Sequence, residues 1–116
     1  MLPFVPGQPV SQLFLDELDR LKSIVADMEK IAVGVKPNEI VEGRDTPTLN
    51  HWGPATREVF VLTGASSGHP LLPGSDRPIV TSSLYLIALD GSWARTRSRW
   101  YRLGEERNET TGYWGR

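Results

Sequence analysis

The feature that most constrains the fold is an apolar stripe near the N-terminus that repeats with the period of an α-helix. Its members recur at alternating spacings of four and three residues: Phe14, Leu18, Leu21, Val25, Met28 and Ala32. Residues at these spacings share one side of a helix. Ser11 can cap the start and Gly34 the end, so the pattern predicts an amphipathic helix over residues 11–33. That stripe must be buried, either within its own domain or in a homodimer.

The chain beyond this helix predicts a β-sheet with many turns, because it holds most of the 11 glycines and 9 prolines. Asp90-Gly91 is typical of a tight hairpin turn between two apolar or aromatic runs. We expect strands at 58–63, 79–89 and 92–103, and a short one at 39–41. A helix followed by such strands predicts the α+β class. The helix would pack on a small antiparallel sheet with the hairpin 79–103 at its centre.

The length of 116 residues suits a single domain. We expect an extended arm over 1–10, one α+β domain over 11–104 and a polar tail over 105–116. The first ten residues lack the basic and apolar segments of a signal peptide, and no apolar run is long enough to span a membrane. These features predict a cytoplasmic protein with no membrane partner.

The composition argues against metal and thiol chemistry. The sequence has no cysteine and only two histidines, His51 and His69. Disulfides and thiolate zinc sites are therefore excluded, and a histidine-rich metal site is not expected. We predict no catalytic residue, no cofactor and no metal.

The stretch Thr63-Gly64-Ala65-Ser66-Ser67-Gly68 is similar to a dinucleotide-binding loop and also spells a G-x-S-x-G nucleophile elbow. Both sites require a helix directly after the loop. Pro70, Pro73 and Gly74 make a helix there unfavourable. We therefore expect the end of a strand and a surface turn in which His69 makes a local hydrogen bond.

The most informative stretch is the arginine-rich run from Trp93 to Arg102. In one continuous strand, Trp93, Arg95, Arg97, Arg99 and Tyr101 would share a face, and Trp100 would anchor the other face beside Ala94 and Thr96. Planar guanidinium groups bind phosphates and carboxylates through paired hydrogen bonds and stack on aromatic rings. We predict a partner-binding surface made of Trp93, Arg95, Arg97, Arg99, Tyr101 and Arg102.

Two questions stay open at the level of sequence. The arginines could be neutralised within the chain by Asp16, Glu17 and Asp19 or by Glu105, Glu106 and Glu109. The register of the hairpin depends on its loop. A two-residue loop places the arginines on the face of Leu84 and Leu86, whereas a three-residue loop with a bulge places them beside Ile87, Tyr85 and Ser83. Stacking on Tyr85 favours the second register.

Several short motifs resemble those of a known but uncharacterised family. They are Gly68-His69-Pro70, Arg77-Pro78-Ile79, Thr81-Ser82 and the block Trp93-Ala94-Arg95-Thr96…Ser98-Arg99-Trp100-Tyr101-Arg102-Leu103-Gly104. They resemble the signature of short, mainly alphaproteobacterial proteins described as a domain of unknown function. The resemblance covers residues 68–104 and implies no activity, cofactor or catalytic residue.

Together these patterns predict a non-enzymatic module that binds a polyanionic partner, such as nucleic acid, through an arginine-rich and aromatic strand. The first alternative is an adaptor or inhibitor that binds an acidic protein surface. An origin in a phage or mobile element would fit either description. The second alternative is a small hydrolase-like enzyme that uses His69 and Ser66, supported by an acid such as Asp76.

Overall fold

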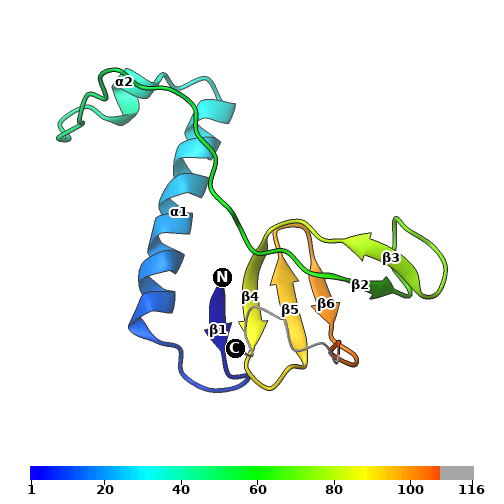
Figure 1. Cartoon of the computed structure of the whole chain (residues 1–116). Helices are drawn as coiled ribbons and strands as arrows, with labels where there is room; N and C mark the ends of the chain where they lie inside the picture. The colour runs from blue at the N-terminus through cyan, green and yellow to red at the C-terminus, as the bar shows by residue number, and fades with distance from the viewer. Residues whose placement is uncertain (108–116) are drawn as a thin grey trace. The chain divides into compact units, whose positions relative to one another are not determined.

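The computed structural model describes residues 1–107 and has the α+β organisation expected from the sequence (Figure 1). It divides into two compact units. The sheet unit comprises Met1–Pro9 and the chain from Glu58 onward, and the helical unit comprises Val10–Arg57. The predicted packing of the helix on the sheet stays a prediction, as do the single domain over 11–104 and the tail over 105–116. Residues 108–116 of that tail lie outside the described residues.

The helical unit confirms the predicted N-terminal helix as α1, Gln12–Ala32. The amide of Phe14 donates a hydrogen bond to Oγ of Ser11, which caps the first turn. Gly34 follows the last turn with a φ of 91°, a conformation that glycine adopts without steric cost. A second, short helix, α2, spans Pro37–Ile40.

The strand expected at 39–41 is therefore wrong. Pro37 fixes a helical φ at the first position of α2. The amide of Lys36 donates to Oε2 of Glu39 at 3.0 Å, which closes this turn. These local interactions outweigh the β-preference of Ile40 and Val41.

The sheet unit contains a four-stranded sheet with the order β1-β4-β5-β6 (Figure 1). Its strands are β1 Leu2–Phe4, β4 Leu84–Ala88, β5 Trp93–Thr96 and β6 Trp100–Arg102. The expected extended arm thus supplies an edge strand. Pro3 is tolerated there because proline has no N–H to donate, and an edge strand needs no donor on its outer side. β1 runs parallel to β4 while the other pairs are antiparallel, so the sheet is mixed rather than wholly antiparallel.

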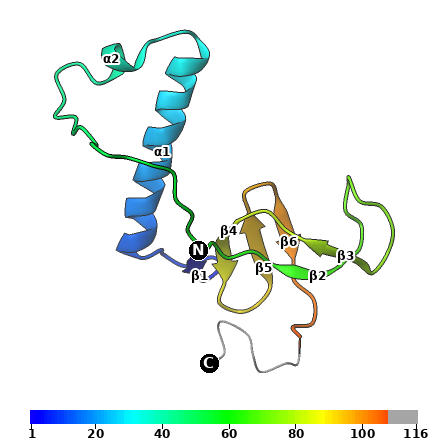
Figure 2. The same cartoon turned by 45° about the horizontal axis from the view of Figure 1, so that its top comes forward.

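A separate two-stranded sheet pairs β2, Thr63–Ser66, with β3, Arg77–Val80. This hairpin projects from the four-stranded sheet beyond β6 (Figure 2). The strand expected at 79–89 is divided between β3 and β4. Thr81 causes the division, because its N–H donates to Leu62 O and its Oγ1 accepts from Leu62 N–H. The chain then changes partners, from β2 to β5.

The central hairpin β4–β5 confirms the predicted pairing of these segments and decides their register. Arg95 lies opposite Leu86 and Ala94 opposite Ile87, with a bulge between Leu84 and Leu86. This is the register of a two-residue loop, so the favoured placement of the arginines beside Ile87 and Tyr85 is wrong. The bulge lies within β4, where no turn residue marks it in the sequence.

The fully buried residues of the described chain lie in this sheet. They are Leu84, Ala88, Ala94 and Thr96. Three of the four are small, which lets chain segments approach closely at the centre of the unit. No helix among residues 1–107 is long and apolar enough to cross a membrane.

Candidate binding site on the four-stranded sheet

The structure places the arginine-rich run on two strands instead of one. β5 ends at Thr96, and β6 begins at Trp100. Arg97 and Ser98 form the tip of a tight turn between them. The predicted ladder of three arginines along a single strand is therefore wrong.

Thr96 explains why the chain turns at this point. Its Oγ1 accepts hydrogen bonds from the amides of Ser98 and Arg99 at 3.2 and 3.3 Å, and it donates to Arg99 O at 3.2 Å. A threonine hydroxyl that binds the next amides favours a turn over continued strand. This threonine was the available sequence signal for the turn.

The turn brings two tryptophans and two arginines to one face of the sheet. Trp93 lies opposite Arg102, and Arg95 lies opposite Trp100. Directly opposed residues of antiparallel strands project from the same face. We call these four residues, Trp93, Arg95, Trp100 and Arg102, the Trp–Arg face.

The side chains of the Trp–Arg face contact one another closely. The guanidinium carbon of Arg102 lies 4.9 Å from the ring centre of Trp93, a cation–π geometry. The rings of Trp93 and Trp100 meet edge to face at 6.3 Å, and Phe4 of β1 meets Trp100 in the same way at 6.2 Å. Trp100 is still 48% exposed and Trp93 36% exposed. The face is thus fixed in geometry yet open to a partner.

The sequence-based interpretation placed Trp100 on the wrong face of the sheet. As an inward anchor it would have shared a face with Ala94 and Thr96, which are indeed buried. The chain reverses at Arg97 and Ser98, and this reversal pairs Trp100 with Arg95 across the two strands. Trp100 therefore lies on the same face of the sheet as Arg95. Phe4 was missed because nothing in the sequence pairs residue 4 with residue 88.

The remaining predicted residues lie elsewhere on the hairpin. Tyr101 lies opposite Ala94, on the other face of the sheet. There its ring is 6.1 Å from the imidazole of His69. Arg97 is exposed at the turn, and its amide donates to Ser83 O at 2.8 Å. Arg99 is half-buried and close enough to His69 to affect its pKa. The structure therefore brings together three of the six predicted residues, with Arg97 and Arg99 at the end of the hairpin.

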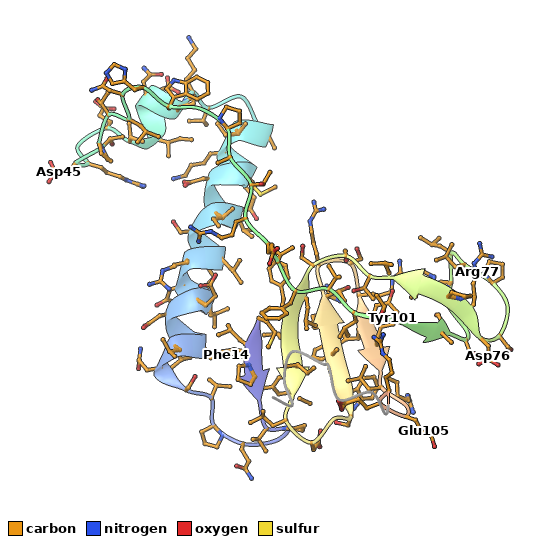
Figure 3. All side chains as sticks on the ribbon, viewed as in Figure 1. Phe14, Asp45, Asp76, Arg77, Tyr101 and Glu105 are labelled. Atoms are coloured by element: carbon orange, nitrogen blue, oxygen red, sulfur yellow. The ribbon has the colours of Figure 1, made fainter. Side chains whose placement is uncertain are left out.

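The described part of the sheet unit gives these arginines no carboxylate partner. None of Arg95, Arg97, Arg99 and Arg102 forms an ion pair with Glu58, Asp76, Asp90, Glu105 or Glu106. Glu105 lies beyond the end of β6 (Figure 3). Glu17, another candidate for internal pairing, binds Arg20 of its own helix at 3.5 Å. Glu109 lies outside the described residues.

His69 holds the β2–β3 loop through local hydrogen bonds, as the sequence predicted. The amides of Leu71 and Leu72 donate to its Nδ1 at 3.0 and 3.1 Å. Partial desolvation, and then the positive charge of Arg99, lower the pKa of His69 below its ordinary value. The two hydrogen bonds to Nδ1 and the positive charge of Arg99 therefore both favour the neutral imidazole of His69 in the folded chain.

Acidification is therefore expected to destabilise the sheet unit through His69. The pKa of His69 is lower in the folded chain than in the unfolded chain. The contribution of His69 to stability is therefore complete above the unfolded-state pKa of about 6.5, and it is lost as the pH falls through the folded-state pKa. His69→Asn should flatten the pH dependence of the melting temperature between about pH 7 and 5, since an Asn oxygen can accept the same amides without titrating. His51→Asn is the matched control. An unchanged pH profile in His69→Asn would contradict this role.

The stretch Thr63–Gly68 has neither of the two site geometries that it resembles. Thr63–Ser66 is strand β2, and turns occupy the chain from Ser67 to Asp76, where both sites need a helix. Nδ1 of His69 is occupied by backbone amides and makes no described hydrogen bond to Ser66. Ser67 uses its Oγ to accept from the amide of Asp76. Within residues 1–107, no three acidic or histidine side chains are grouped as metal ligands.

Comparison with known proteins gives one match. Residues 14–110 match the description "Family of unknown function (DUF6634)". The chain belongs to this family. The matched region of DUF6634 includes nearly all of α1 and every strand except β1. No curated protein and no solved structure matches the chain.

The DUF6634 match confirms the expected resemblance to a domain of unknown function and extends it well beyond residues 68–104. The family carries no assigned activity to this chain. Any function must therefore be argued from the geometry of its own residues.

Proposed function

We propose that this DUF6634 protein is a non-enzymatic, cytoplasmic module that binds single-stranded nucleic acid through the Trp–Arg face and Arg97. The observation that carries the proposal is the stacking of Arg102 on Trp93 beside the half-exposed Trp100, with no described carboxylate paired to these arginines. We also propose that the short motifs noted in the sequence are those of this family and that its members are mainly alphaproteobacterial.

The chemistry of the cations supports a phosphate-containing partner. Every basic side chain of the sheet unit is an arginine, since the three lysines, Lys22, Lys30 and Lys36, belong to the helical unit. Arginine binds phosphate oxygens in pairs and stacks on flat rings, whereas lysine acts as a compact point charge. An all-arginine surface therefore suits a ligand that presents both phosphates and bases.

The exposed aromatic rings favour a single strand over a duplex. Unpaired bases can stack on tryptophan, and each such contact contributes about 1–3 kcal/mol. A duplex keeps its bases stacked internally and offers mainly its phosphates. Trp100 and the Arg102–Trp93 pair would stack with bases, while Arg95 and Arg97 would bind the adjacent backbone.

Binding to labelled single strands of DNA and RNA, and to duplexes, tests the proposal at about 50 and 200 mM salt. We expect affinity for single strands that falls as salt rises. Arg95→Ala and Arg97→Ala should each weaken binding and reduce the log–log salt slope by about 0.7 per lost phosphate contact. The control is Arg77→Ala, on β3 at the far end of the β2–β3 hairpin from Tyr101 (Figure 3).

Failure of the native protein to bind any strand at low salt would overturn the nucleic-acid proposal, as would equal loss in Arg77→Ala. Circular dichroism of each variant shows whether its fold is intact. Only losses in folded variants count as support.

An acidic protein surface is the second candidate. The chain has 14 acidic and 13 basic residues, and its net charge of −1 gives no long-range attraction to either partner, so the choice rests on the local surface. Tryptophan and arginine are also enriched among the residues that dominate protein interfaces. A partner retained after nuclease treatment, and lost in Arg95→Glu/Arg102→Glu, would support this candidate.

A further inference from the structure

The apolar stripe of α1 belongs to the helical unit, whereas the proposed nucleic-acid surface belongs to the sheet unit. No residue of α1 is buried. Leu18, Val25 and Met28 are 37, 52 and 64% exposed, and Ile24 and Ile31 flank them at 54 and 50%. Phe14 begins the stripe near the start of α1 (Figure 3). A 21-residue helix with such a face needs a partner, because isolated helices gain little stability from propensity alone.

The stripe has the spacing of a coiled-coil seam. Taking Leu18 as position a of a heptad places Val25 and Ala32 at a, and Phe14, Leu21 and Met28 at d. Ile24 and Ile31 then fall at g and broaden the seam. Val25 at a with Leu21 at d is the combination that favours two strands over three or four in parallel coiled coils. The same side holds a shallow hollow lined by Ile24, Asp27, Met28, Ile31 and Ala32, of the kind that receives a side chain from a facing helix.

We propose that the occupant of this stripe is α1 of a second copy of the chain, in a parallel, two-stranded arrangement. The charged residues beside the seam are the reason for choosing a parallel dimer. Glu17 is at g and Lys22 at the following e, which face each other between parallel helices in register. A symmetric dimer therefore forms two Glu17–Lys22 pairs across the seam.

An antiparallel arrangement lacks this complementarity. With the two stripes fully overlapped, Lys22 would face its own counterpart, so a like-charge contact would replace the two Glu17–Lys22 pairs. The existing pair between Glu17 and Arg20 does not block the parallel arrangement. At 3.5 Å and with both side chains well exposed, it contributes little and can be exchanged.

Sedimentation of the full chain over a wide concentration range tests the dimer. We expect a monomer–dimer equilibrium that Val25→Glu weakens about tenfold or more, because it places two like charges in the seam. Ser23→Glu adds the same charge at the outer position f and should leave the equilibrium nearly unchanged. A chain that stays monomeric at every concentration, or equal effects of the two variants, would overturn the proposal.

Charge reversal tests the parallel orientation on its own. Glu17→Lys and Lys22→Glu should each weaken self-association, because each creates two like-charge contacts across the seam. Mixing the two variants should restore association, since the mixed dimer regains two opposite-charge pairs. A dimer whose formation is insensitive to both reversals, or whose mixture gains nothing, would refute the parallel arrangement.

Discussion

Replacing Ala94 with leucine is expected to lower the free energy of unfolding of the sheet unit by about 1–3 kcal/mol. Ala94 has no exposed surface and lies in β5, between Ile87 of β4 and Tyr101 of β6. The larger side chain can enter this position only by moving neighbouring strands or adopting an unfavourable rotamer. Urea denaturation followed by tryptophan fluorescence measures the loss, because Trp93 and Trp100 belong to the same sheet.

Ala65→Leu provides the matched control for this substitution. Ala65 lies in β2 and is exposed, so the added atoms should meet solvent and change stability by less than about 0.5 kcal/mol. If Ala94→Leu were as stable as Ala65→Leu, the centre of β5 would not be closely packed. The register of the β4–β5–β6 sheet would then need revision.

Thr96→Val is expected to lower the free energy of unfolding by about 1–3 kcal/mol, which is the typical penalty for leaving a buried polar group unpaired. Thr96 is 1% exposed and binds two amides and one carbonyl in the β5–β6 turn. The amide of Ser98 retains Oγ of Ser82 as an acceptor at 3.2 Å, and Arg99 O retains the amide of residue 96 as a donor at 2.9 Å, so the loss falls mainly on the amide of Arg99. Valine has nearly the same shape, and the experiment therefore isolates the hydroxyl.

Thr96→Ser separates the hydroxyl from the methyl group. Serine can make the same three hydrogen bonds, so the serine variant should be clearly more stable than the valine variant in thermal denaturation. Each kcal/mol corresponds to about 4–8 °C in a unit of this size. Equal melting temperatures for the two variants would show that the hydroxyl does not hold the turn.

The same hydroxyl connects stability to the proposed site. The Trp–Arg face exists because the chain reverses at Arg97 and Ser98, which places Trp100 and Arg102 across from Arg95 and Trp93. In a continuous strand, Trp100 and Arg102 would have faced away from Trp93 and Arg95. Thr96→Val should consequently weaken nucleic-acid binding although residue 96 itself is buried.

Local chemistry made the helical part of this protein predictable from sequence. The spacing of the stripe, the cap at Ser11 and the glycine at position 34 all act within one or two turns, and α1 begins and ends within a residue of the expected bounds. The α+β class, the β4–β5 pairing and the local hydrogen bond of His69 rest on similarly short-range signals. The local role of Pro37 at the start of α2 was missed, although the signal was present.

The tertiary structure alone decided which strands pair and which faces their side chains share. Parallel pairing of β1 with β4 joins residues more than eighty positions apart, and no turn motif specifies such a contact. The bulge in β4 and the hydrogen bonds of Thr81 and Thr96 shift the alternation of side chains. Since side chains alternate with a period of two, a small shift moves a residue to the opposite face. The sequence therefore determined the residues available for binding, whereas long-range pairing determined that Trp100 joins Arg95 and Tyr101 does not.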